Sequence, residues 1–84
     1  MYKVLMTRRA EKDLKALERS EKNRVIPAIT ALAETPRPSG CLKVKSEPGV
    51  WRIRVGDLRI GYSIDDVELE VTVLRIVHRR EFYD

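Results

Sequence analysis

The sequence has very little of what most metal and thiol sites are built from. Its 84 residues include one cysteine, Cys41, and one histidine, His78. An internal disulfide is therefore impossible, and the usual ligand set of a zinc site cannot be assembled. There is no glycine-rich phosphate-binding loop. We expect no cofactor and a metal-independent chemistry, because four clustered carboxylates fit a turn and an outward-facing strand better than a metal site: Asp65, Asp66, Glu68 and Glu70.

Long apolar runs are also missing. The longest stretch without a charged residue covers residues 25–33, whereas a membrane-spanning helix needs about 20 apolar residues. Residues 1–9 lack the apolar segment and the small-residue cleavage site of a signal peptide. We therefore expect one cytoplasmic domain over residues 1–84, without membrane contact and only marginally stable on its own.

Charge, in contrast, is abundant and slightly positive. Charged residues make up 36% of the chain and the net charge is +4, which favours a nucleic acid or an acidic protein as partner. Residues 41–84 hold eight basic and eight acidic side chains, so this half is not basic overall. Only the arrangement of its arginines can produce a basic surface there.

Such an arrangement is found in residues 51–62, where apolar and basic residues alternate. Successive side chains of a strand point to opposite faces. Arg52, Arg54 and Arg59 therefore fall on one face of a predicted hairpin. The opposite face takes the apolar residues Trp51, Ile53, Val55, Leu58, Ile60, Tyr62 and Ile64.

The turn of this hairpin fixes its register. Gly56 and Asp57 form a two-residue loop with glycine first, which is typical of a type II′ turn. That turn places Arg54 opposite Arg59 and Arg52 opposite Gly61. Like charges directly opposite each other destabilise a sheet, so this face indicates a polyanionic ligand and not a contribution to stability.

The remaining elements follow from periodicity and from helix breakers. We expect a first strand at residues 2–6, a helix from Arg8 to about Glu18 capped by Thr7, and a second helix to about Glu34 capped by Ser20. Pro27 lies inside the second helix, which either bends there or begins after Ser20. Further strands are expected at residues 42–45 and 69–77 and in the hairpin of residues 50–64. The segment 69–77 is apolar at nearly every position, which predicts a strand covered on both faces and central in the sheet.

These elements predict an α+β fold in the order β-α-α-β-β-β-β. The two N-terminal helices pack on one face of a small, mostly antiparallel sheet. The arginines lie on the other face.

The arginines suit one reaction in particular, the cleavage of an RNA phosphodiester by its own 2′-hydroxyl. The catalyst must remove the 2′ proton, stabilise charge on phosphorus and protonate the leaving 5′ oxygen. The planar fork of arginine holds two phosphate oxygens and stays charged. Three residues that follow the last strand can fold back beside the arginines and assist them: Arg79, Arg80 and Tyr83.

Each candidate also has a structural interpretation. Exposed arginines are commonly just solvated, and Tyr83 fits packing against the sheet equally well. His78 is either a general base or a structural residue at a strand end. Arg75, inside the last strand, is either buried with a partner such as Asp57 or Glu70 or adds to the basic face.

Several segments together resemble the RelE/ParE toxin superfamily over essentially the whole chain. They are Trp-Arg-Ile-Arg-Val-Gly-Asp-Leu-Arg-Ile-Gly-Tyr at residues 51–62 and Val-Leu-Arg-Ile-Val-His-Arg-Arg-Glu-Phe-Tyr at residues 73–83. The Lys-Asp-Leu-Lys-Ala-Leu helix and the Pro-Arg-Pro loop at residues 36–38 also match. The resemblance implies a RelE-like fold and the toxin of a type II toxin–antitoxin module.

The resemblance further implies an mRNA interferase, an endoribonuclease that cuts mRNA on the ribosome without a metal. By position, Arg59 matches a phosphate-holding arginine, Arg80 an arginine that stabilises the transition state, and Tyr83 a tyrosine that stacks on the base and moves protons. The implied partners are a cognate antitoxin, the ribosome with its mRNA, and operator DNA through the antitoxin only. We expect the antitoxin to bind as an extended, acidic, amphipathic segment.

The chain departs from the family at two positions that often carry lysine, Arg52 and Arg54. Arginine is a poor proton carrier, so both are interpreted as RNA-binding groups, which leaves proton transfer to Tyr83 or His78. Two alternatives stay open. One is a ParE-like inhibitor of DNA gyrase, and the other is a catalytically weak homologue that binds its antitoxin and acts as an operator co-repressor.

Overall fold

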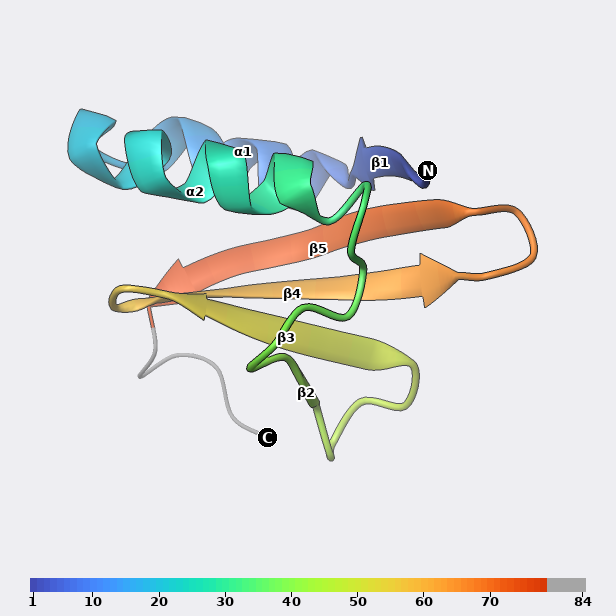
Figure 1. Cartoon of the computed structure of the whole chain (residues 1–84). Coiled ribbons are helices and arrows are strands. Elements are labelled where there is room, and N and C mark those ends of the chain that lie inside the picture. The colour runs from blue at the N-terminus through green and yellow to red at the C-terminus, as the bar shows by residue number, and fades with distance from the viewer. Residues whose placement is uncertain (79–84) are drawn as a thin grey trace.

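The computed structural model describes residues 1–78 of the chain. Within these residues, five strands and two helices follow one another in the predicted order (Figure 1). The elements are β1 (Lys3–Met6), α1 (Arg8–Ala16), α2 (Arg19–Ala31), β2 (Leu42–Lys43), β3 (Val50–Val55), β4 (Leu58–Asp65) and β5 (Glu70–His78).

The strands form one sheet in the order β1-β5-β4-β3-β2. β1 runs parallel to β5, and each other pair of neighbours is antiparallel. β5 therefore lies inside the sheet, as its nearly continuous apolar sequence predicts. The predicted α+β class and the packing of two helices on a mostly antiparallel sheet are confirmed.

Thr7 starts α1 as predicted and also ties it to the sheet. Its Oγ1 accepts the backbone N–H of Ala10 at 3.1 Å, which satisfies one of the free donors of the first turn. The same hydroxyl donates to the carbonyl of Leu74, and the Thr7 N–H donates to the carbonyl of Val73. The start of α1 is thus fixed against β5.

The predicted start of α2 is wrong by two residues. Glu18, and not Ser20, is the N-cap, in a capping box in which Glu21 accepts the Glu18 N–H at 3.0 Å. Pro27 lies within the helix, which does not begin after it. The carbonyl that loses its donor belongs to Asn23, an exposed residue where water can replace the bond. The helix ends at Ala31, earlier than predicted.

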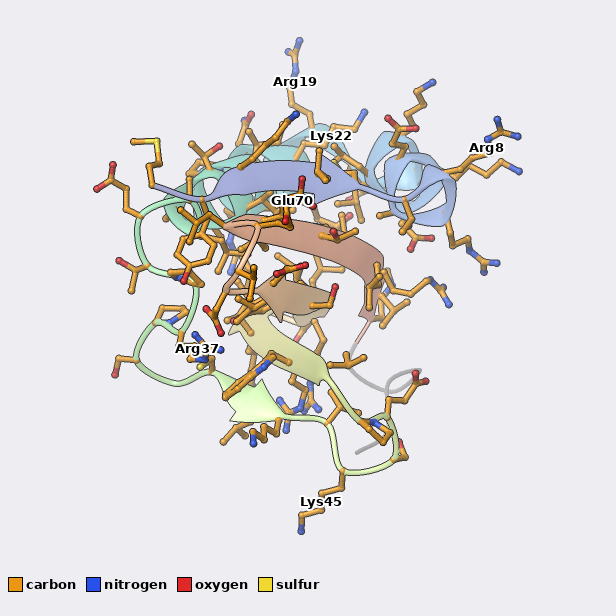
Figure 2. All side chains as sticks on the ribbon, turned by 90° about the vertical axis from the view of Figure 1, so that its right-hand side faces the viewer. Arg8, Arg19, Lys22, Arg37, Lys45 and Glu70 are labelled. Carbon is orange, nitrogen blue, oxygen red and sulfur yellow. The ribbon has the colours of Figure 1, made fainter. Side chains whose placement is uncertain are left out.

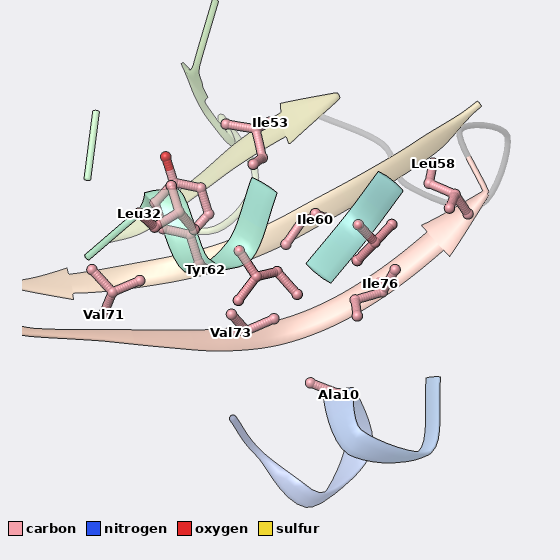
Figure 3. Close-up of a cluster of buried hydrophobic side chains, with 11 residues drawn as sticks. Ala10, Leu32, Ile53, Leu58, Ile60, Tyr62, Val71, Val73 and Ile76 are labelled. Carbon is pink, nitrogen blue, oxygen red and sulfur yellow. The ribbon is translucent and has the colours of Figure 1, made fainter. Parts of the chain in front are cut away.

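The core lies between the helices and one face of the sheet (Figure 3). Ala10 of α1 and Leu32 after α2 meet the apolar side chains of the inner strands, among them Ile60, Tyr62 and Val73. Tyr62 is fully buried, and its hydroxyl donates to the Pro36 carbonyl at 2.7 Å. This bond anchors the loop that follows α2.

Burial raises the pKa of Tyr62 far above its ordinary value, with a smaller contribution from Cys41. The unfolded chain ionises this phenol near pH 10 while the folded chain retains the proton. Stability from this group is therefore complete below pH 10 and falls above it, by about 1.4 kcal/mol per pH unit.

We expect Tyr62→Phe to reduce this alkaline loss of stability. At neutral pH the variant loses about 1 kcal/mol, because the Pro36 carbonyl loses its donor. Urea denaturation between pH 8 and pH 11.5 measures both effects. An unchanged slope above pH 10 would contradict the assignment to Tyr62.

Candidate functional site

The hairpin of β3 and β4 has the register predicted from its turn. Arg54 pairs with Arg59, Arg52 with Gly61 and Val55 with Leu58. Gly56 has φ +61° and Asp57 does not have a positive φ, which is the pattern of a type II′ turn. The alternation of the strands therefore places the three arginines on one face, which we call the arginine face, away from the core residues.

The three side chains differ in exposure. Arg54 is exposed and its Nε donates to the Gly56 carbonyl at 3.3 Å, which holds the side chain over the turn. Arg52 and Arg59 are half-buried. Gly61, directly across from Arg52, has no side chain, so no side chain faces Arg52 from the paired position of β4. The sheet keeps two arginines opposite each other because the other face of the hairpin is anchored in the core.

Arg75 does not join the arginine face through its guanidinium. Its Cα pairs with Gly61, but its Nε donates to Oδ2 of Asp13 in α1 at 2.9 Å. An acidic partner was one of the two predicted alternatives, but the examples given for it, Asp57 and Glu70, were wrong. Asp13 takes this place because α1 lies along the part of the β5 edge that β1 leaves uncovered. Arg75 is thus a link between α1 and the sheet.

His78 is placed on the other side of the sheet from Arg59. It pairs with Leu58, a core residue on the helix-covered face. Its Nε2 lies 3.5 Å from Oε2 of Glu21 in α2. The structure therefore supports the structural interpretation of His78 more than the role of general base. Arg79, Arg80 and Tyr83 lie outside the described residues.

A second basic cluster was missed in the sequence. The guanidinium of Arg37 lies 5.1 Å from the ring centre of Trp51, and the Lys43 ammonium lies 5.4 Å from it. Arg37 also forms a bidentate pair with Asp66, which accepts a bond from Tyr2. The Arg37 guanidinium, together with Tyr2, lowers the pKa of Asp66. The pairing of Lys43 with Trp51 depends on β2, which covers Leu42–Lys43 and not the predicted residues 42–45.

Other basic side chains are spread over the surface. Figure 2 shows Arg8, Arg19 and Lys22 projecting outward from the helix layer, at the opposite end of the molecule from Lys45. The net charge is therefore not concentrated at the arginine face. The arginine face is basic because three arginines project from the same side of two adjacent strands.

The carboxylate cluster lies at the turn between β4 and β5, where Asp65 and Asp66 were predicted to form a turn; Glu68 also lies in this turn and not on a strand as predicted, whereas Glu70 begins β5. Oδ1 of Asp65 accepts the N–H groups of Val67 and Glu68 at 3.0 and 2.9 Å. Among residues 1–78, no three His, Cys, Asp or Glu side chains are grouped so that they could hold a metal ion. Neither helix of this part of the chain has the length and apolar character needed to cross a bilayer.

Comparison with known proteins gives a consistent result. The family model described as the ParE toxin of the type II toxin–antitoxin system parDE matches residues 4–83. Among curated protein sequences, none matches the chain.

Similar solved structures include the RelE–RelB complex of Pyrococcus horikoshii, with a TM-score of 0.81 and 23% identity over 93% of this chain and 94% of that one. The RelBE2 complex of Mycobacterium tuberculosis has a TM-score of 0.72 and 30% identity over 93% and 98% of the two chains. The isolated RelE toxin of E. coli has a TM-score of 0.80 and 20% identity over 93% and 84%. With a family model that spans nearly the whole sequence and a fold to match, this chain belongs to the RelE/ParE superfamily of type II toxin–antitoxin toxins.

Proposed function

We propose that the protein is a ribosome-dependent endoribonuclease that cuts mRNA through attack of the RNA 2′-hydroxyl. The observation that carries this proposal is the arginine face, where Arg52, Arg54 and Arg59 project from adjacent strands. The planar fork of each guanidinium can hold two phosphate oxygens, so three such groups on adjacent strands suit a phosphodiester and its flanking phosphates.

In this reaction the arginines stabilise negative charge on the phosphate and do not transfer protons. Arg59, half-buried between β3 and β5, is best placed to hold the non-bridging oxygens of the scissile phosphate as negative charge develops. Arg52 and Arg54 bind the flanking phosphates. Arg80 is proposed to share the charge on the scissile phosphate, and Tyr83 to stack on a base and carry the proton.

The proposed partner is an antitoxin that restrains this activity. Similar toxins from Pyrococcus horikoshii, E. coli and Methanococcus jannaschii were solved in complexes with RelB antitoxins. A positively charged toxin attracts an acidic antitoxin over long range at low salt. Operator DNA is proposed to be bound through the antitoxin alone.

Inhibition of DNA gyrase is the second candidate function. The matching family model is that of the ParE toxins. In this case the arginine face would have no substrate phosphate. The two candidates differ in target, so one pair of assays separates them.

The experiment is in-vitro translation with the purified chain. We expect mRNA to be cut only when ribosomes are present, and Arg80→Ala and Tyr83→Phe to slow cutting by about 10²-fold or more. Gyrase supercoiling is measured in parallel. Intact mRNA together with trapped gyrase–DNA complexes would replace the nuclease proposal with the second candidate.

A further inference from the structure

A groove beside Trp51 lies on the face of the sheet opposite the arginine face. Trp51 packs against the core, and Lys43, directly across from it in β2, shares that face. The groove has a volume of about 560 Å³, within the range of about 300–1,000 Å³ that is typical of ligand pockets. We call it the Trp51 groove; it is lined by Arg37, Lys43, Lys45, Trp51 and the turn at residues 48–49.

The charges in the Trp51 groove favour an anion from outside. Among the described residues that line it, the charged ones are all basic: Arg37, Lys43 and Lys45. Arg37 is paired with Asp66. Within residues 1–78, neither lysine forms an ion pair, and both are exposed. Two cations are therefore left for a ligand.

The indole of Trp51 favours a nucleotide over an acidic peptide. Trp51 is half-buried, so part of its ring faces the groove. Proteins that bind unpaired nucleotides stack the base on an aromatic ring and hold the phosphates with nearby cations, whereas a carboxylate gains little from an indole. The Lys43 ammonium lies over the ring, and such a contact is weak at an exposed site. A base can therefore replace the ammonium, which then binds a phosphate.

The borders of the Trp51 groove are held in place by local bonds. Pro48 and Gly49 occupy the centre of a turn in which the Val50 N–H donates to the Glu47 carbonyl at 3.1 Å. Gly49 has φ +82°, so the turn has the features of type II. On the opposite border, the two bonds to Asp66 fix the Arg37 guanidinium. The groove is thus formed before a ligand arrives, which lowers the entropic cost of binding.

We propose that the Trp51 groove binds an unpaired nucleotide of ribosomal RNA, with the base against Trp51 and the phosphates on Lys43 and Lys45. The inference rests on the proposed ribosome-dependent cleavage and adds a second RNA contact to it. The groove and the arginine face lie on opposite faces of the sheet, so the nucleotide bound here belongs to a different RNA segment from the one that is cut. This contact raises the affinity for the ribosome and takes no part in the reaction.

The first test uses the fluorescence of Trp51, which is the only tryptophan of the chain. The probe is oligoadenylate with 2′-O-methyl groups, which cannot be cut through the 2′-hydroxyl. We expect it to quench Trp51. The double variant Lys43→Ala/Lys45→Ala is expected to bind about tenfold more weakly, and its plot of log affinity against log salt concentration to be shallower by about 0.7 per lysine. Lys12→Ala/Lys15→Ala, with the same loss of charge at exposed positions of α1, is the matched control and is expected to behave as the unmodified chain.

The second test uses ribosomes and separates this contact from the cleavage site. Lys43→Ala/Lys45→Ala is expected to cosediment more weakly with ribosomes that carry no mRNA. On ribosomes with mRNA it is expected to raise KM about tenfold and to leave kcat unchanged. Arg59→Ala is expected to show the opposite pattern, with slow cleavage and undiminished quenching of Trp51. Circular dichroism confirms that the variants fold.

Three results would overturn the proposal. One is unchanged fluorescence of Trp51 with oligoadenylate. Another is equal quenching by poly-L-glutamate with the same dependence on the two lysines, because an acidic protein would then fit the groove as well. The third is an effect of the lysine variants only on ribosomes that carry mRNA, because the mRNA itself would then occupy the groove. Absence of mRNA cleavage, with quenching and binding to empty ribosomes retained, would support this site and count against the nuclease alone.

Discussion

Arg59→Ala is expected to slow ribosome-dependent mRNA cleavage by about 10²–10³-fold. Removing one preorganised group that stabilises developing charge typically costs that much in rate. Arg59 lies at the centre of the arginine face, paired with Arg54 on one side and Val77 on the other. Its loss therefore removes the cation closest to the middle of the proposed phosphate site. Single-turnover cleavage on ribosomes, read by primer extension, measures the change.

Two further variants make this result specific. Arg59→Lys keeps a positive charge but loses the planar fork, so it is expected to recover only part of the rate. Arg8→Ala removes an exposed cation of α1, which projects away from the sheet (Figure 2), and is expected to leave cleavage unchanged. If Arg59→Ala cuts at the unmodified rate, the proposed phosphate site is wrong. If Arg8→Ala is as slow as Arg59→Ala, net charge and not the arginine face explains RNA binding.

The hairpin could be predicted in detail because its information is local. The Gly56-Asp57 turn fixes which residues pair, and the two-residue periodicity of a strand fixes which face each side chain takes. Once the turn type is correct, the grouping of Arg52, Arg54 and Arg59 follows. The apolar run of β5 likewise indicated its position inside the sheet.

The parts that could not be predicted depend on contacts between distant segments. Arg75 binds Asp13 because α1 covers the β5 edge beyond the four residues of β1. Neighbouring residues in the sequence do not predict this pair, nor the contact of His78 with Glu21. Arg37 reaches Trp51 only through the path of the loop after α2, which the buried Tyr62 hydroxyl fixes by binding the Pro36 carbonyl.

Asp13 connects α1 to the sheet through two hydrogen bonds. Its Oδ2 accepts both the Arg75 Nε–H and the backbone N–H of Ile76, each at 2.9 Å. The Asp13 side chain is 14% exposed, so both bonds are largely shielded from water. The Ile76 N–H lies beyond the stretch of β5 that pairs with β1, and a carboxylate from a helix takes the place of a strand carbonyl.

Asp13→Ala is therefore expected to lower the free energy of unfolding by about 2–4 kcal/mol. The Ile76 N–H loses its acceptor away from water, and the Arg75 guanidinium loses its carboxylate partner. For a domain of this size, 1 kcal/mol corresponds to about 4–8 °C in melting temperature, so the loss is easily measured by thermal denaturation. Glu11→Ala, at an exposed position of α1, is the control and is expected to change stability by less than about 0.5 kcal/mol.

Asp13→Asn separates charge from hydrogen bonding. Its amide oxygen can still accept both bonds, so this variant is expected to be more stable than Asp13→Ala and less stable than the unmodified chain. Equal stability of Asp13→Ala and Glu11→Ala would contradict the assignment. Because β5 pairs directly with the strand that carries Arg59, Asp13→Ala should also lose mRNA cleavage as the temperature approaches its lowered melting point. Well below that temperature its rate should equal that of the unmodified chain, since Asp13 supports the sheet and does not contact the arginine face.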